Sequence, residues 1–134
     1  MSGVSAIRFI LANNSALTAA VPAANIFVGT VPLNTVLPAI GVTKISGVPN
    51  NTVAMTESGR IQTERVQVTL LAKTSTDQLV IGRLIRAAVP NRSGTVNGVH
   101  VDSILPDSDG PDLDDDTTSI LENSRDFIVR WHLP

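Results

Sequence analysis

Cysteine is absent from this sequence and aromatic residues are scarce. The chain has no Cys and no Tyr, and its aromatic residues are three Phe and one Trp. The absence of Cys excludes disulfides, thiolate metal sites and cysteine nucleophiles, and it fits assembly in a reducing cytoplasm. The scarcity of aromatics leaves little surface for stacking on nucleic-acid bases, and it requires a core built from aliphatic side chains.

Long apolar runs are missing as well. No stretch approaches the ~18 residues of a membrane-spanning helix, and the first residues lack the charged and hydrophobic segments of a signal peptide. We therefore expect a soluble protein that has no membrane partner and is not exported. With 134 residues, 43% of them hydrophobic and 16% charged, the chain has enough apolar surface to fold as a single domain over residues 1–134.

Charge is distributed unevenly along the chain. Residues 1–101 hold eight Lys and Arg against three Asp and Glu, a net charge of +5, whereas residues 102–134 hold two against nine, a net charge of −7. Such a split can create opposed surface potentials that favour head-to-tail association of subunits. An acidic loop that happens to lie late in the chain explains the same numbers without any function.

The first third of the sequence predicts two short helices and two strands. Apolar residues at helical spacing predict a helix over residues 5–11, and Ser15 is expected to cap a second short helix. Runs rich in β-branched residues predict strands at 26–28 and 39–46. The polar stretch 47–59 is typical of a long loop or an extended β-hairpin arm.

The clearest strand and the clearest helix follow each other in the middle of the chain. Apolar and polar residues alternate over residues 60–72, which predicts a strand with one buried face. Ser75 and Gln78 then form the capping box of a helix that carries Arg83 and Arg86 on its outer side. The expected buried face of this helix consists of Val80, Ile81, Leu84, Ile85 and Ala88.

Three features of the last third complete the fold prediction. Asn97-Gly98 lies between two β-rich runs and predicts a tight hairpin, because both turn positions need positive φ. Residues 106–118, with six Asp, are expected to form a solvated acidic loop, and residues 126–133 a last strand whose core face carries Phe127, Val129, Trp131 and Leu133. The order of elements predicts an α+β fold: a mainly antiparallel sheet packed by one major helix plus an N-terminal helix, in a two-layer sandwich.

Two histidines and one aspartate are the residues that most suggest a metal site. His100 and Asp102 share a face of one predicted strand, and His132 lies on a strand that can be its neighbour, so a cluster is geometrically possible. No local ligand motif such as H-E-x-x-H accompanies them. The sequence therefore predicts no bound metal, and a small metal-dependent enzyme that uses these three residues is only an alternative from another class.

The acidic segment allows three interpretations. It contains Asp107, Asp109, Asp112, Asp114, Asp115 and Asp116. A calcium loop is disfavoured, because the segment lacks the Gly of an EF-hand and Asn123 stands where its last ligand, a Glu, is required. The two other interpretations are an ordinary solvated loop and the lining of a channel, where carboxylates repel the phosphates of passing DNA.

Sequence motifs of catalysis are missing, and the arginines give only a weak signal for nucleic-acid binding. We find no G-x-S-x-G elbow, P-loop, Rossmann glycine fingerprint or zinc-finger spacing, so the sequence predicts no cofactor and no enzyme activity. Arg83, Arg86 and Arg92 lie on the outer side of the main helix and just after it, which favours solubility or subunit pairing. Pairing with the acidic loop of a neighbour would be a head-to-tail contact, which closes into a ring when the rotation permits.

Six segments spread over nearly the whole chain carry a resemblance to a known family. In one-letter code they are ALTAAV at 16–21, IFVG at 26–29, LPAIGV at 37–42, RVQVTLLA at 65–72, LIRAA at 84–88 and RDFIVRW at 125–131. Their order resembles that in the tail terminator or tail-completion (head-tail joining) proteins of tailed bacteriophages. The resemblance implies a structural virion protein without an active site, placed at the tail top or neck and assembled in the host cytoplasm.

The resemblance also implies partners and a mode of action. It indicates a ring of identical subunits, often hexameric, at the head-proximal end of the tail, where the ring ends tube growth and joins tail to head. The implied partners are the chain itself, the tail tube protein and a head-tail connector or stopper protein, with DNA only passing through the channel. The alternative within the same particle is a head-tail adaptor or stopper of the neck.

Our hypothesis for subunit contacts centres on the arm at 47–59. Such an arm lays strand edges or apolar anchors on a neighbouring subunit. The candidate interface residues are Val53, Met55, Glu57, Arg60, Arg83 and Arg86.

Overall fold

Helical elements and strands follow each other in blocks along the chain in the computed structural model, which describes residues 3–32, 34–50, 61–89, 93–110, 112–115 and 120–132. The helical elements are α1 (Gly3–Ala12), α2 (Ser15–Ala20), the short 3-10 turn η1 (Ala23–Asn25) and α3 (Ser75–Ala88). The strands are β1 (Ile26–Val28), β2 (Ala39–Asn50), β3 (Ile61–Ala72), β4 (Gly94–Val96), β5 (Val99–Asp109), β6 (Leu113–Asp115) and β7 (Ile120–His132).

The described strands form one mixed sheet in the order β1-β2-β3-β7-β5-β4, with β6 paired to β7. β1 runs parallel to β2, and all the other pairs are antiparallel. The sequence predicts a mainly antiparallel sheet, and the parallel β1 makes it a mixed one. The chain leaves β1 at Gly29, whose φ of 91° favours glycine and whose N–H donates to the Val42 carbonyl oxygen at 2.7 Å.

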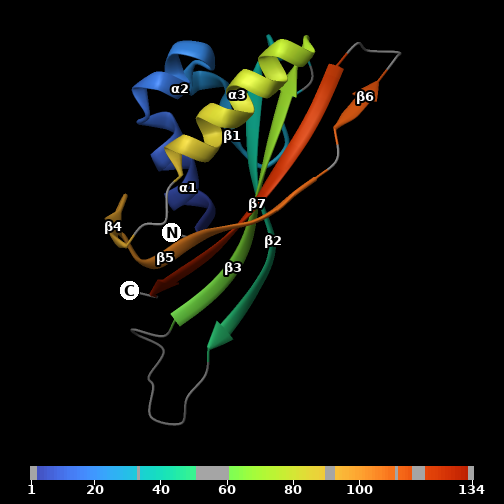
Figure 1. Cartoon of the computed structure of the whole chain (residues 1–134). Coiled ribbons are helices and arrows are strands. Elements are labelled where there is room, and N and C mark those ends of the chain that lie inside the picture. The colour runs from blue at the N-terminus through green and yellow to red at the C-terminus, as the bar shows by residue number, and fades with distance from the viewer. Residues whose placement is uncertain are drawn as a thin grey trace.

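The three α-helices gather on one side of the sheet, as Figure 1 shows. α1 packs against β1, β2 and β3, while α3 packs against β3 and β7. The buried side chains between them form one hydrophobic cluster, which includes Ile7, Leu17, Ile40, Ile85 and Phe127. We call this side of the sheet the helix face and the opposite side the open face. The lower parts of β2 and β3 extend beyond the helices (Figure 1).

Two helices begin with a different cap from the predicted one. Asn14, not Ser15, caps α2, because its side chain accepts a hydrogen bond from the backbone N–H three residues later at 2.9 Å. Thr74, not Ser75, caps α3 in the same way at 3.1 Å. Both residues can accept this bond, so local pattern alone did not distinguish a cap from its neighbour.

The buried face of α3 differs in one place from the prediction. Ile81, Ile85 and Ala88 are buried and Leu84 is partly buried, but Val80 is exposed to 47%. Gly82 is buried, and a Cβ there would collide with the Arg125 guanidinium. The helix is thus rotated so that it rests on an arginine of β7 as well as on aliphatic side chains.

Strand occurs in two segments, of which one was predicted as a long loop or a β-hairpin arm and the other as a loop. Residues 47–50 belong to β2 and pair with residues 61–64 of β3, which supports the hairpin form of the predicted arm, while residues 51–60 lie outside the described part. The acidic stretch 106–118 was predicted as a solvated loop, but β5 continues to Asp109 and residues 113–115 form β6. Both strands pair with β7, and this long-range partner is invisible in the local composition.

The remaining strand predictions are confirmed within the described residues. Asn97 and Gly98, with φ of 48° and 78°, form the turn between β4 and β5. Phe127, Val129 and Trp131 are buried on the core face of β7. β7 begins earlier than predicted, at Ile120, and Leu133 lies outside the described residues.

No helix in the described ranges is both long enough and apolar enough to cross a membrane.

Candidate functional site

Three charged side chains meet on the open face. The Arg65 guanidinium on β3 donates to Asp107 on β5 and to Asp126 on β7, the latter at 3.2 Å. The hydrogen bond to Asp107 raises the pKa of Arg65 above its usual value, and the hydrogen bond to Asp126 raises it by a smaller amount. Its contribution to stability is therefore fully present below the ordinary arginine pKa and is lost only as the pH rises through the raised value. The Arg65 guanidinium therefore stays charged throughout the neutral range.

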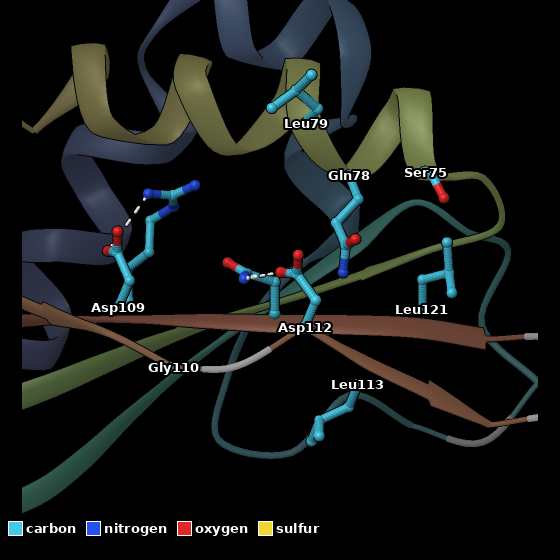
Figure 2. A pocket seen from close by; sticks show the side chains of 10 residues that line it. Ser75, Gln78, Leu79, Asp109, Gly110, Asp112, Leu113 and Leu121 are labelled. Atoms are coloured by element: carbon cyan, nitrogen blue, oxygen red, sulfur yellow. Dashed lines mark hydrogen bonds and ion pairs between the residues drawn. The ribbon is translucent and has the colours of Figure 1, made fainter.

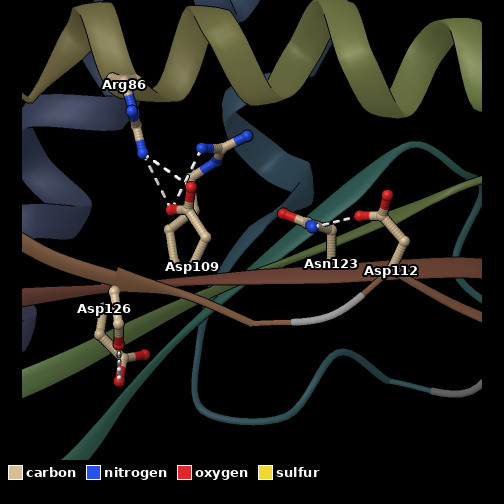
Figure 3. A network of polar contacts seen from close by, with 7 residues as sticks. Arg86, Asp109, Asp112, Asn123 and Asp126 are labelled. Atoms are coloured by element: carbon tan, nitrogen blue, oxygen red, sulfur yellow. Dashed lines mark hydrogen bonds and ion pairs between the residues drawn. The ribbon is translucent and has the colours of Figure 1, made fainter.

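A second ionic cluster lies on the helix face (Figure 3). The Asp109 carboxylate accepts from Arg86 of α3 at 2.8 and 3.0 Å and from Arg125 of β7 at 3.3 Å. The Arg125 side chain is only 18% exposed, since it lies beneath Gly82. One carboxylate at the end of β5 thus joins α3 to β7.

A groove of about 700 Å³ opens beside this cluster, between the start of α3 and the β5–β6 segment (Figure 2). It is lined by Ser75, Gln78, Leu79, Asp109, Gly110, Asp112, Leu113, Leu121, Asn123 and Arg125. Leu79 and Leu113 are exposed, and the Asn123 amide donates to Asp112. The Gln78 side-chain nitrogen is buried and has no hydrogen-bond partner among the described residues. This mixture of exposed leucines and amide groups suits a side chain of a partner protein.

The outer edge of β2 is the second exposed feature. β1 covers β2 only from Ile40 to Val42, and from Thr43 to Val48 no described strand pairs with that edge. Ile45 is 50% and Val48 60% exposed, and the register of β2 against β3 shifts at Ile45. Sequence analysis placed interface residues further along the arm and did not single out these two. The sequence signal that was available is that Ile45 breaks the alternation set by Ile40 and Val42.

The predicted interface residues fall into two groups. Val53, Met55, Glu57 and Arg60 lie outside the described residues. Arg83 is exposed on α3, whereas Arg86 is held by Asp109 of its own chain.

The acidic residues are likewise divided. Asp107 and Asp109 pair with arginines, and Asp112 pairs with Asn123. Asp114 and Asp115 belong to β6, and Asp116 lies outside the described residues.

The structure brings His100, Asp102 and His132 together. His132 Nε2 lies 3.1 Å from Asp102 Oδ1, and the two imidazole centroids are 4.6 Å apart in an edge-on arrangement. His100 and His132 are register partners on the adjacent strands β5 and β7. Sequence analysis predicted the shared face of His100 and Asp102 but not that His132 stands directly opposite.

Glu64 is a buried carboxylate that sequence analysis did not identify. It lies on β3 and is 2% exposed, and its Oε2 accepts a hydrogen bond from the N–H of Gly3 at 3.0 Å. Gly3 is the first residue of α1, so Glu64 satisfies one of the free N–H groups at that helix end. The alternation of β3 shows that Glu64 shares the face of Val66 and Val68, and this is the signal that was available.

Comparison with solved structures shows that other proteins share this fold. A chain of a structure described as the virion of a native gene transfer agent particle superposes with a TM-score of 0.71 at 10% identity, covering 98% of this chain and 96% of that one. A second solved structure superposes with a TM-score of 0.61 at 14% identity, covering 100% and 98%. At such identities the likeness concerns the fold. Among curated protein sequences, none matches the chain significantly.

The sequence itself identifies the family. Residues 5–121 match the family described as tail completion protein gp17, and the chain belongs to that family. The resemblance to phage tail-completion proteins is thereby confirmed, and the chain is a structural protein of the tail or neck of a phage-like virion.

Proposed function

We propose that the chain forms an oligomeric ring at the head-proximal end of the tail, where the ring ends tube growth and joins tail to head without any catalysis. Membership of the tail-completion family supports a place in the tail for this chain. The observation that carries the ring is the outer edge of β2, which exposes Ile45 and Val48 over a stretch that β1 does not cover.

A strand edge of this kind requires either protection or a partner. Unpaired N–H and C=O groups on a sheet edge attract other strands, and natural proteins limit this with bulges and lysines. β2 has both, because Lys44 precedes the register shift at Ile45. Indiscriminate strand pairing is thus hindered, while the exposed Ile45 and Val48 side chains remain as apolar anchors for one defined neighbour.

The proposed interface continues along the arm, and α3 contributes a separate contact surface. Beyond Asn50 it includes Val53, Met55, Glu57 and Arg60, which lie outside the described residues. Arg83 and Arg86 form the contact surface on α3, and Arg86 would keep its bond to Asp109. The neighbours are a second copy of the chain, the tail tube protein and a head connector or stopper protein.

The acidic segment has a smaller role in this proposal. Arg65 and Arg86 already compensate Asp107 and Asp109 within the chain. Compensated carboxylates repel phosphate weakly, so we assign Asp107 and Asp109 to the outer surface and not to the lining of a DNA channel.

The first test is the mass of the purified protein by light scattering, with negative-stain images of the same fractions, alone and with tail tubes. The wild-type chain is expected to form closed rings, and deletion of Asn50 to Ser58 is expected to abolish them while the circular dichroism spectrum stays that of a folded protein. Rings that persist in the deletion variant would remove the arm from the interface. A wild-type chain that forms no ring alone or on tubes would refute the proposal.

A point variant tests the β2 edge more narrowly. Val48→Lys places a charge on the proposed contact, whereas Val36→Lys places one on a side chain that is 73% exposed in the segment before β2. We expect the first variant to lose rings and the second to keep them. If the wild-type ring binds a head connector and ignores tube ends, the chain acts as an adaptor or stopper of the neck.

A further inference from the structure

Three side chains with metal-binding atoms converge near the C-terminal end of β7, on the open face. They are His100 and Asp102 of β5 and His132 of β7, and their candidate ligand atoms all lie within 4.8 Å of one another. Because Val99, Val101 and Trp131 are buried on the helix face, the alternation of both strands turns the three side chains away from the core. The cluster is therefore accessible to solvent and separate from the core.

We propose that His100, Asp102 and His132 form a binding site for a divalent ion of the zinc class. Two imidazoles and one carboxylate are a donor set that Zn²⁺ accepts, and three protein ligands leave a fourth position for water. The site does not depend on the ring proposed above. It also differs from the prediction made from sequence, in which no local motif indicated a metal.

The strand register supplies the geometry that a chelate needs. His100 and His132 stand directly opposite each other on paired antiparallel strands, where Cβ atoms are roughly 4.5–5.5 Å apart. Zn–N bonds of about 2.0–2.1 Å in a tetrahedron require ligand atoms roughly 3.3 Å apart. Rotation about the side-chain torsions of His100 and His132 can bring their ring nitrogens to this separation. His132 Nε2 and Asp102 Oδ1, 3.1 Å apart, already have the spacing of two ligands.

A β-bulge adds the third ligand. The register of β5 against β7 shifts between Val101 and Ser103, so Asp102 has no partner in the ladder. Bulges redirect side chains and are common beside functional sites. Here the bulge frees Asp102 from pairing, and its carboxylate faces His132.

The surrounding charges permit a cation. On the two strands that flank the β5–β7 pair, the register partner of His100 is Thr95 of β4 and that of His132 is Ile61 of β3, both uncharged. Arg130, two residues before His132 and exposed, is the nearest basic residue along β7 and opposes a cation, while the Asp102 carboxylate favours it. A bound ion would tie the start of β5 to the end of β7, and water would occupy its fourth position.

The test uses the full-length chain without a histidine tag, stripped with a chelator and then titrated with ZnCl₂. We expect saturable binding of one Zn²⁺ per chain by calorimetry and by elemental analysis after dialysis, and a rise in Tm on loading. Co²⁺ in place of Zn²⁺ is expected to give the visible absorption of a tetrahedral site.

Variants assign the ion to these ligands. His100→Ala, His132→Ala and Asp102→Asn are each expected to weaken Zn²⁺ binding by about tenfold or more. Asp107→Asn, which removes another exposed carboxylate of β5, is expected to leave it unchanged. Asp102→Asn is nearly isosteric, and histidine NMR signals of the wild type that shift on loading identify the imidazole ligands even if an alanine variant does not fold.

Two results would overturn the site. One is the absence of saturable Zn²⁺ binding by the stripped wild-type chain. The other is binding that Asp102→Asn and both histidine variants leave intact, because the ion would then be held elsewhere.

Discussion

At the scale of single residues, Glu64 shows how one buried carboxylate can support a helix distant in sequence. It accepts the N–H of Gly3 at the start of α1, 61 positions away. Replacement by Ala leaves that N–H buried without its acceptor, which costs about 1–3 kcal/mol of the free energy of unfolding. Urea unfolding followed by circular dichroism measures this loss, and faster amide exchange confined to α1 would locate it.

Glu64→Gln is the matched control for this prediction. It keeps a carbonyl oxygen for Gly3 and replaces the other carboxyl oxygen by an amide nitrogen, so the loss of stability should be smaller than for Glu64→Ala. Equal losses for the two variants would show that the charge, not the acceptor, matters here.

Gly41 is the second residue whose identity the packing requires. A Cβ at this position would lie 2.7 Å from the backbone oxygen of Gly29, which leads out of β1. Backbone cannot rotate away as a side chain can, so Gly41→Ala should separate β1 from β2 and cost about 1–3 kcal/mol. The urea midpoint measures the effect.

Gly47→Ala serves as the comparison for Gly41→Ala. Its added Cβ would meet the flexible end of Lys44 at 3.0 Å, and that end can move. We expect a change within about 0.5 kcal/mol. A Gly41→Ala variant as stable as the wild type would mean that β1 tolerates displacement.

At the scale of elements, Asp109 joins α3, β5 and β7. Because Arg86 and Arg125 both bond to it, Asp109→Asn and Arg86→Gln should each destabilise the fold, with a coupling energy of about 0.5–1 kcal/mol in a double-mutant cycle. The pair is partly exposed, so the coupling should shrink in 1 M NaCl as charges are screened.

The control cycle mutates Arg83, a neighbouring arginine on the surface of α3, and leaves Arg86 unchanged. Arg83→Gln combined with Asp109→Asn should show no coupling. Coupling of the same size in both cycles would indicate a general field of charges instead of a specific bond.

Element prediction from sequence succeeded where the signal was local. The alternation in β3 and the Asn97-Gly98 turn were both predicted, because each depends only on neighbours in the chain. The strand character of residues 106–109 was not predicted, because it comes from pairing with β7 and from the arginines that compensate the aspartates. The predicted helix caps were wrong by one residue, because adjacent residues of both caps have side chains that can accept the capping hydrogen bond.

The candidate sites follow the same division. That His100 and Asp102 share a face follows from strand periodicity, but their meeting with His132 depends on the register of β5 against β7, which no short pattern records. The exposed edge of β2 depends on how far the short β1 reaches along it. In each case the residue types were visible in the sequence and their proximity was not.

At the scale of the whole molecule, the basic and acidic parts of the sequence form ion pairs with each other within one subunit. Arg65 and Arg86, from the basic part of the chain, pair with Asp107 and Asp109 of the acidic part. Charges compensated inside one subunit contribute little to attraction between subunits. The charge distribution therefore gives less support to an electrostatic head-to-tail contact than the sequence alone implies.

This internal compensation leads to a prediction about ring assembly. If apolar anchors at Ile45 and Val48 hold the subunits together, raising NaCl from about 50 mM to about 0.5 M screens charges but leaves the ring mass by light scattering unchanged. Val48→Lys should dissociate the ring at both salt concentrations. Rings that dissociate at high salt while Val48→Lys assembles normally would instead place charged contacts in the interface, with Arg83 as the first residue to replace.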